Sequence, residues 1–281
     1  MTIAISIKVN DGVVLAADSA ASMVGRDSAG NIGVYTIYQN ADKIFNLKKE
    51  SPIGAITWGS GGIGTASIST IVKDFRKMTE NPEGEWFINP NDYSLQDVAR
   101  NFRRFVFDEK YQEAFGDWEE DQRPAIGFII AGYSSNEDMA EEWRIAINHG
   151  NCPDPEEVRD RNDSGIIWNG EPEAITRLYY GFSSGLSTLL QESGFIDPAN
   201  IDQLMAMLSQ RLAVPLITPP MPIQDAIDLS KFLVDMTIKY KRFCPGAPTV
   251  GGPIDVAAIT KHEHFKWIQR KHYYDQVLNP P

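Results

Sequence analysis

The chain has 281 residues, 42% of them hydrophobic, and its 38 acidic and 26 basic side chains give a net charge of −12. The hydrophobic share is sufficient for a buried core and argues against an intrinsically disordered chain. Because no basic patch dominates, the composition argues against nucleic-acid partners, which need a basic surface for the phosphates. The two cysteines are expected to be free thiols in a reducing compartment.

The N-terminal segment lacks the basic and apolar regions of a secretory signal, and the longest apolar runs are too short to cross a bilayer. We therefore expect a cytoplasmic protein that does not bind membranes. One domain is expected over residues 1–281, with a core at 2–260 and a C-terminal extension at 261–281. No metal or cofactor is expected, because the chain has no CxxC motif and the His262-Glu263-His264 segment is typical of a solvated tail.

Alternating apolar residues predict a strand at residues 3–9, and the turn signal Asn10-Asp11-Gly12 leads into an apolar strand that ends at Asp18. Residues 23–38 indicate a loop or a small hairpin. Further strands are predicted at residues 43–47, 53–58, 125–133, 143–147, 165–168, 178–181 and 254–260. Helices are predicted to begin near residues 64 and 94, after residue 185, and at residues 201–212 and 224–240.

The order of these elements is strands, two helices, strands, helices and a final strand. Such blocks differ from the regular βα alternation of a parallel doubly wound fold. The sequence therefore predicts an α+β fold in which two antiparallel sheets pack face to face, with helices outside.

Thr2 is a candidate nucleophile. Removal of Met1, which is usual before a small residue, would leave Thr2 with a hydroxyl group and a free α-amine. The reference pKa of an α-amine is about 7.7–8.0, so this amine can act as a general base near neutral pH. Many ordinary chains also begin Met-Thr, and Thr2 alone is therefore weak evidence.

The residues around Thr2 strengthen this hypothesis. Asp18 interrupts an apolar strand, where an unpaired carboxylate would be costly, and Lys43 begins another strand. A buried Asp18–Lys43 pair would hold positive charge near the Thr2 hydroxyl and lower its effective pKa. Backbone N–H groups in the glycine-rich turn after Trp58 could stabilise an oxyanion. Taken separately, each residue could equally be an ordinary cap, strand end or turn.

The segment from Thr2 to Ser19, TIAISIKVNDGVVLAADS, resembles the start of mature proteasome β-type subunits and of related bacterial threonine peptidases, which are N-terminal-nucleophile hydrolases. Similar segments follow in the family's order up to about residue 260. They are Asp42-Lys43-Ile44, Ala55-Ile56-Thr57-Trp58-Gly59-Ser60, Ile130-Ala131-Gly132-Tyr133, Tyr180-Gly181-Phe182-Ser183-Ser184-Gly185, Asp225-Ala226-Ile227-Asp228-Leu229 and Pro253-Ile254-Asp255-Val256.

The resemblance implies a four-layer αββα sandwich and a role for each matching residue. Thr2 would be the nucleophile and proton acceptor, Lys43 would tune its hydroxyl, and Asp18 would orient Lys43. Gly59 would donate the oxyanion hydrogen bond and Ser184 would support the terminal amine. The residues implied in substrate binding are Ser22, Thr57 and Gly61.

Two departures from the family pattern stand out. The spacing from Asp18 to Lys43 is long, which indicates an insertion within residues 23–38 near the pocket. The family's late acidic residue is missing, since Arg242 lies near its place and Pro245 lies where a serine is usual. The second departure weakens the expected support of the terminal amine.

The favoured function is thus a threonine-type endopeptidase that acts on peptides or unfolded proteins, with Thr2 exposed by removal of Met1. Confinement in a homo-oligomeric ring or a related closed assembly is expected, and the identity of any ATPase or regulator is left open. Two alternatives remain: a catalytically inactive structural subunit of a proteasome-like assembly, and an N-terminal-nucleophile amidase that acts on a small amide.

Overall fold

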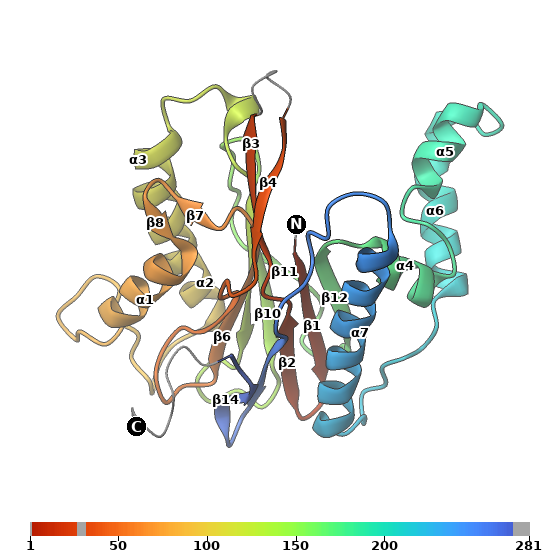
Figure 1. Ribbon diagram of the computed structural model, residues 1–281. Helices are drawn as coiled ribbons and strands as arrows, with labels where there is room; N and C mark the ends of the chain where they lie inside the picture. Colours follow the sequence, from red (N-terminus) through yellow and green to blue (C-terminus); the bar gives the residue numbers. More distant parts are fainter. Residues whose placement is uncertain (1, 27–31, 272–281) are drawn as a thin grey trace.

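The structure is a computed structural model that describes residues 2–26 and 32–271. The expected removal of Met1, part of the expected loop or hairpin at 23–38, and the end of the expected C-terminal extension lie outside the described residues. Two five-stranded antiparallel sheets form the centre of the molecule (Figure 1).

The first sheet has the strand order β12-β1-β2-β13-β14. Its strands are β1 (Ile3–Val9), β2 (Gly12–Ala17), β12 (Gly165–Gly170), β13 (Asp255–Thr260) and β14 (His264–Gln269). The predicted hairpin at the start of the chain is confirmed, because β1 and β2 pair from Ala4–Ala17 to Val9–Gly12. Strands from the two ends of the chain therefore lie side by side.

The second sheet has the strand order β11-β10-β9-β6-β5. Its strands are β5 (Ile44–Asn46), β6 (Ile53–Gly59), β9 (Ile126–Gly132), β10 (Glu141–Ile147) and β11 (Glu156–Glu157). The two sheets bury apolar residues against each other, such as Leu15 and Ile259 from the first sheet and Ile56 and Ile129 from the second. This core fixes the strand ends that carry the candidate site.

Helices cover the outer faces of both sheets, because each helix has one apolar stripe to bury. On the second sheet these are α1 (Ile68–Met78) and α2 (Leu95–Arg103), which continues as the π-helix η1 (Arg104–Tyr111) and as α3 (Gln112–Phe115). A short 3₁₀ helix, η2 (Glu120–Gln122), follows. On the first sheet they are α4 (Glu173–Tyr180) and the long α7 (Ile223–Phe243).

Although helices lie on both main sheets, the expectation of a four-layer αββα sandwich is wrong for the described residues as a whole. The described residues form four antiparallel sheets, since β3 (Ala21–Arg26) pairs with β4 (Ile32–Tyr38) and β7 (Gly62–Ile63) pairs with β8 (Ala66–Ser67) as separate two-stranded sheets. The β3–β4 pair stands beyond the sheets in Figure 1, and exposed Val24 and Tyr35 show that it is not buried in a sandwich.

Two further helices also depart from the expected layers. They are α5 (Leu186–Ser193) and α6 (Pro198–Leu212), which lie against each other at the side of the molecule, away from the sheets (Figure 1). Of the residues in these two helices, Ile201 alone is buried. Both helices do contain apolar side chains, but these are largely left exposed, as Leu189 and Leu212 show.

The strand predicted at residues 178–181 is wrong, because these residues end helix α4 and form its cap. Ala174 and Ile175 are buried on the inner face of this helix, and Tyr179 packs edge-on against Trp168 of β12. Gly181 then ends the helix with φ 78°, a left-handed conformation that favours glycine. The apolar face formed by Ala174 and Ile175 explains why this segment is helical.

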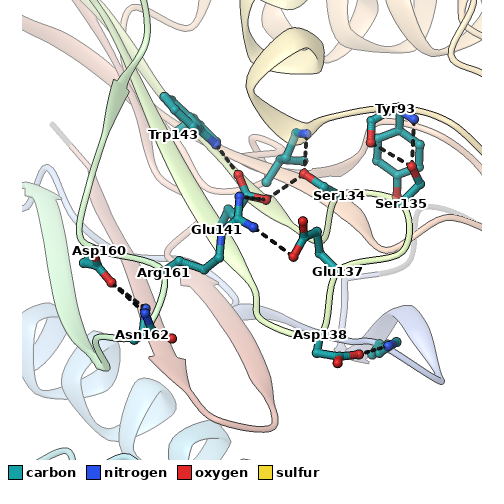
Figure 2. A network of polar contacts seen from close by, with 12 residues as sticks. Tyr93, Ser134, Ser135, Glu137, Asp138, Glu141, Trp143, Asp160, Arg161 and Asn162 are labelled. Carbon is teal, nitrogen blue, oxygen red and sulfur yellow. Dashed lines mark hydrogen bonds and ion pairs between the residues drawn. The ribbon is translucent and has the colours of Figure 1, made fainter.

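A polar network closes the end of the second sheet that lies opposite Gly59. Figure 2 shows the carboxylate of Glu141 between the indole N–H of Trp143, at 3.0 Å, and the hydroxyl of Ser134, at 2.6 Å. Arg161 reaches both Glu141, at 3.2 Å, and Glu137, at 2.9 Å. These bonds attach the loop after β11 to the sheet and leave the opposite end open for the candidate site.

Within residues 2–26 and 32–271, no helix is long and apolar enough to span a bilayer.

Candidate active site

Thr2 lies immediately before β1 and is 5% exposed. Its carbonyl oxygen accepts a hydrogen bond of 2.7 Å from the backbone N–H of Glu171, which follows β12. The next N–H, that of Ile3, donates to Oδ1 of Asp18 at 3.0 Å. The backbone at Thr2 is therefore held from both neighbouring strands.

Asp18 and Lys43 form the buried ion pair that the sequence suggested. Nζ of Lys43 lies 2.5 Å from Oδ1 of Asp18, and their side chains are 6% and 0% exposed. Oδ2 of Asp18 accepts from the backbone N–H groups of Ala20, at 3.1 Å, and Gly251, at 3.0 Å. The carboxylate thus binds three backbone N–H groups and one ammonium group, which fix the direction of the Lys43 side chain.

The pKa of Lys43 is below the ordinary value of 10.5, because burial disfavours its charged form. The negative charge of Asp18 and its hydrogen bond oppose this shift, and the positive charge of Lys271 adds to it. Lys43 is therefore a lysine whose proton is held less tightly than usual.

Thr2 and Lys43 line one open cavity of about 930 Å³. The predicted substrate-binding residues Ser22, Thr57 and Gly61 also line it, together with Gly59. Asp18 lies behind Lys43 and is fully buried. The cavity wall also includes residues that the sequence did not single out, which are Met23, Asp42, Lys73, Phe115, Trp118 and Gln122.

Gly59 ends β6 in a conformation that requires glycine. Its φ is 92°, and a Cβ atom added there would lie 2.4 Å from the carbonyl oxygen of Ala125. Gly61, by contrast, has no atom within 4 Å of such a Cβ. The bend therefore requires a residue without a Cβ atom at position 59. This bend turns the chain along the cavity wall.

Thr57 has a structural bond at this wall. Its backbone N–H donates to the carbonyl oxygen of Lys43 at 2.9 Å, and its hydroxyl donates to the carbonyl oxygen of Gly127 at 2.9 Å. Both bonds join β6 to its neighbours and hold the start of β5. The hydroxyl of Ser22, which also lines the cavity, is buried and has no hydrogen-bond partner among the described residues.

Ser184 does not lie on the cavity wall, and its hydroxyl is bound elsewhere. It donates to Oε2 of Glu173 at 2.5 Å, and Ser183 donates to the same carboxylate at 2.9 Å. Partial burial acts to raise the pKa of Glu173, but hydrogen bonds from Ser184, Ser183 and Arg177 outweigh it and lower this pKa to about 2. Ser183 and Ser184 therefore bind the Glu173 carboxylate at the start of α4.

Three groups near Thr2 and Asp18 were missed by the sequence analysis. The N–H of Gly251 binds Asp18, and Lys271, in the expected C-terminal extension, forms a buried pair with Asp255. Near the place where the family's acidic residue is missing from this sequence, Lys241 pairs with Glu171 at 3.1 Å. No local motif marks these residues, because each contact joins segments far apart in the chain.

Among the described residues, no group of three or more His, Cys, Asp or Glu side chains is placed to hold a metal ion.

No family model matches the chain, and no curated protein matches it. Among solved structures, Anbu (ancestral beta-subunit) from Yersinia bercovieri has a TM-score of 0.51 and 15% identity, covering 97% of this chain and 89% of that one. A Gly-1 mutant of Anbu from Hyphomicrobium sp. strain MC1 has a TM-score of 0.53 and 17% identity, covering 99% and 90%. At these identities the likeness concerns the fold.

These comparisons correct the family that the sequence motifs suggested. The two solved structures described above are Anbu proteins, which form a family distinct from the proteasome β-type subunits. The N-terminal motif is short compared with the whole chain, so it does not by itself separate proteasome-like families.

Proposed function

We propose that the chain is a threonine-type peptidase with Thr2 as its nucleophile. The observation that carries this proposal is the common cavity, because Thr2 and Lys43 both line it and Asp18 holds Lys43 from behind. The Anbu-like fold supports a hydrolase at the level of architecture. The nucleophile, the base and the substrate class are our assignments from the chemistry of the residues.

In the proposed reaction, the α-amine of Thr2 accepts the proton of the Thr2 hydroxyl as the oxygen attacks the peptide carbonyl carbon. Lys43 supplies positive charge that stabilises the developing alkoxide, and the Gly59 N–H donates to the carbonyl oxygen as it becomes an oxyanion. The tetrahedral intermediate then breaks its C–N bond, and the leaving amine takes the proton. Water hydrolyses the resulting ester and restores the Thr2 hydroxyl.

The cavity is large for a small-molecule site. A volume of about 930 Å³ lies at the upper end of the ~300–1,000 Å³ range of small-molecule sites. Ser22 and Gly61 both line it, and we assign their backbone groups to an extended peptide. The cavity thus has room for an extended peptide, and we keep the endopeptidase as the proposed activity.

The proposal requires that Thr2 becomes the first residue of the mature chain. Intact mass spectrometry should show the loss of Met1, and short fluorogenic peptides should be cleaved by the wild type and by Thr2→Ser, but not by Thr2→Ala. Thr70→Ala, which changes another threonine of the cavity wall, is the matched control and should retain activity. Retained Met1, or full activity in Thr2→Ala, would contradict the proposal.

The bonding of Ser184 favours one second candidate, a catalytically silent subunit. Its hydroxyl is bound to Glu173, which removes the expected support of the terminal amine. An epoxyketone that reacts with N-terminal threonine separates the two functions. An adduct on Thr2 supports the peptidase, and its absence on a chain that has lost Met1 supports the silent subunit.

We further propose that the protein works in the cytoplasm as a closed homo-oligomer that confines its cavity. Both cysteines are free thiols, which fits a reducing compartment. Exposed apolar side chains on α5, α7 and the loop after α5, among them Leu189, Phe195 and Phe243, offer surface for contacts between copies. Native mass spectrometry would give the number of subunits, and a monomer at micromolar concentration would contradict the assembly.

A further inference from the structure

A second buried lysine lies behind the candidate site. The side chain of Lys271, which follows β14, is 5% exposed and forms ion pairs with Asp255 and, at 3.5 Å, with Asp42. Its ammonium group also donates to the hydroxyl of Ser19 at 2.9 Å. The side chain of a lysine within the expected C-terminal extension is thus buried.

The partners of Lys271 adjoin the Asp18–Lys43 pair along the chain. Ser19 follows Asp18, and Asp42 precedes Lys43 and lines the cavity with it. Asp255 begins β13 opposite Ala17, the residue before Asp18. Lys271 therefore binds all three segments that meet at the Asp18–Lys43 pair.

The cluster has more acidic than basic groups. At their formal charges, the carboxylates of Asp18, Asp42 and Asp255 exceed the ammonium groups of Lys43 and Lys271 by one. Without Lys271 the surplus would be two negative charges, with Lys43 as the remaining cation of the cluster. The negative charge of Asp255, which already acts on Lys43, would then no longer be offset by Lys271.

We propose that Lys271 is a positioning residue of the active site, which neutralises Asp42 and Asp255 so that Lys43 stays on Asp18 and faces Thr2. This inference rests on the proposed threonine-peptidase function. Lys271 does not line the cavity, so it acts through Lys43 and not on the substrate. Its loss increases the negative field at Thr2 and disfavours the alkoxide that forms during attack.

The charges around Lys43 predict the direction of a measurable shift. Asp18, Asp255 and Lys271 act on it directly, and Asp42 adjoins it, while Lys73 of α1 faces the same cavity. The positive charge of Lys271 lowers the pKa of Lys43, and the negative charge of Asp255 raises it. Removing Lys271 should therefore raise the Lys43 pKa, and removing the Asp255 charge should lower it.

The test compares Lys271→Met, Lys271→Arg, Asp255→Asn and the double variant Lys271→Met with Asp255→Asn. Lys261→Met is the matched control, because Lys261 lies in the same C-terminal segment and pairs with exposed Asp138. The Lys43 pKa is followed by nitrogen NMR of the ε-amine. Peptide cleavage gives kcat and KM for each variant.

We expect Lys271→Met to raise the Lys43 pKa and to lower kcat about tenfold with little change in KM. The double variant should recover most of this loss, because it restores the charge balance. Lys271→Arg and Lys261→Met should resemble the wild type. A merely structural role predicts the reverse for the double variant, since removing a second partner would damage the cluster further.

The inference is overturned if Lys271→Met leaves the Lys43 pKa unchanged, or if the double variant is worse than Lys271→Met. If Lys271→Met does not fold, Asp255→Asn still decides, because an unchanged or raised Lys43 pKa in that variant refutes the electrostatic role. The NMR titration does not require catalysis. A wild type without peptidase activity would therefore refute the proposed function while the role of Lys271 is tested separately.

Discussion

Replacing Asp18 by alanine should destabilise the protein more than replacing Lys43 by methionine, although both changes break the same ion pair. The reason is that the two partners have different numbers of other bonds. The Asp18 carboxylate also accepts hydrogen bonds from the N–H groups of Ile3, Ala20 and Gly251. No bond from Nζ of Lys43 to another group is seen in the described part of the chain.

The magnitudes follow from these contacts. Breaking a buried ion pair by removing one partner costs about 3–5 kcal/mol. Asp18→Ala also leaves three buried N–H groups without an acceptor, each at about 1–3 kcal/mol before water enters the space. Lys43→Met leaves the carboxylate with its three N–H donors, so its cost should lie at the low end of the first range. The difference between the two variants should be at least about 2 kcal/mol.

The assay is urea unfolding at neutral pH, followed by circular dichroism, with the slope of each transition compared before the free energies of unfolding are subtracted. Lys73→Met, which removes a lysine on the cavity wall from the exposed surface of α1, controls for the loss of a positive charge near the site. Equal losses in Asp18→Ala and Lys43→Met would refute the reasoning, because the three N–H bonds would then contribute nothing.

Three further predictions concern other parts of the structure. Gly59→Ala should lose at least about 2 kcal/mol of stability in urea and abolish peptide cleavage, because its φ is positive and its Cβ meets a carbonyl oxygen, whereas Gly61→Ala should keep wild-type stability. Burial raises the pKa of the Cys152 thiol to about 11, so a disulfide reagent at pH 8 should modify Cys244 first and Cys152 only after unfolding; simultaneous modification would contradict this. The Glu173 pKa of about 2 lies below its ordinary value of 4.5, so the contribution of this carboxylate to stability is fully present above pH 4.5 and is lost as the pH falls towards 2. The wild type should therefore be more stable than Glu173→Gln by about 2 kcal/mol above pH 4.5, and this difference should disappear between pH 4.5 and pH 2.

The part of the site that the sequence predicts is local. Alternation through Val9 and the Asn10-Asp11-Gly12 turn define the first hairpin, and that hairpin brings Asp18 back beside the start of β1. A carboxylate at the end of a buried strand requires a cation, and Lys43 was the available candidate. The catalytic roles of Thr2, Asp18 and Lys43 remain predictions, although the geometry brings these residues together.

The parts that the sequence did not predict depend on contacts between distant segments. The hydroxyl of Ser184 binds Glu173, because the chain turns back after α4 and places the start of that helix within reach. The segment with β14 was expected to be an extension, yet it pairs with β13 and delivers Lys271 to the buried cluster. No periodicity within either segment encodes its partner. The sequence also did not predict that β3 and β4 form a separate sheet. Their side chains, among them Val24 and Tyr35, are exposed and do not join the main core.

The position of β13 next to β2 has a consequence for synthesis of the chain. The sheet that carries Thr2 joins the first 17 residues to Asp255–Thr260, and Asp18 also needs the N–H of Gly251. A ribosome must therefore translate nearly the whole chain before the Asp18–Lys43 pair has all its bonds. Contacts of such long sequence separation form late in folding. Nascent and truncated chains would therefore carry Thr2 without the complete set of bonds around the Asp18–Lys43 pair.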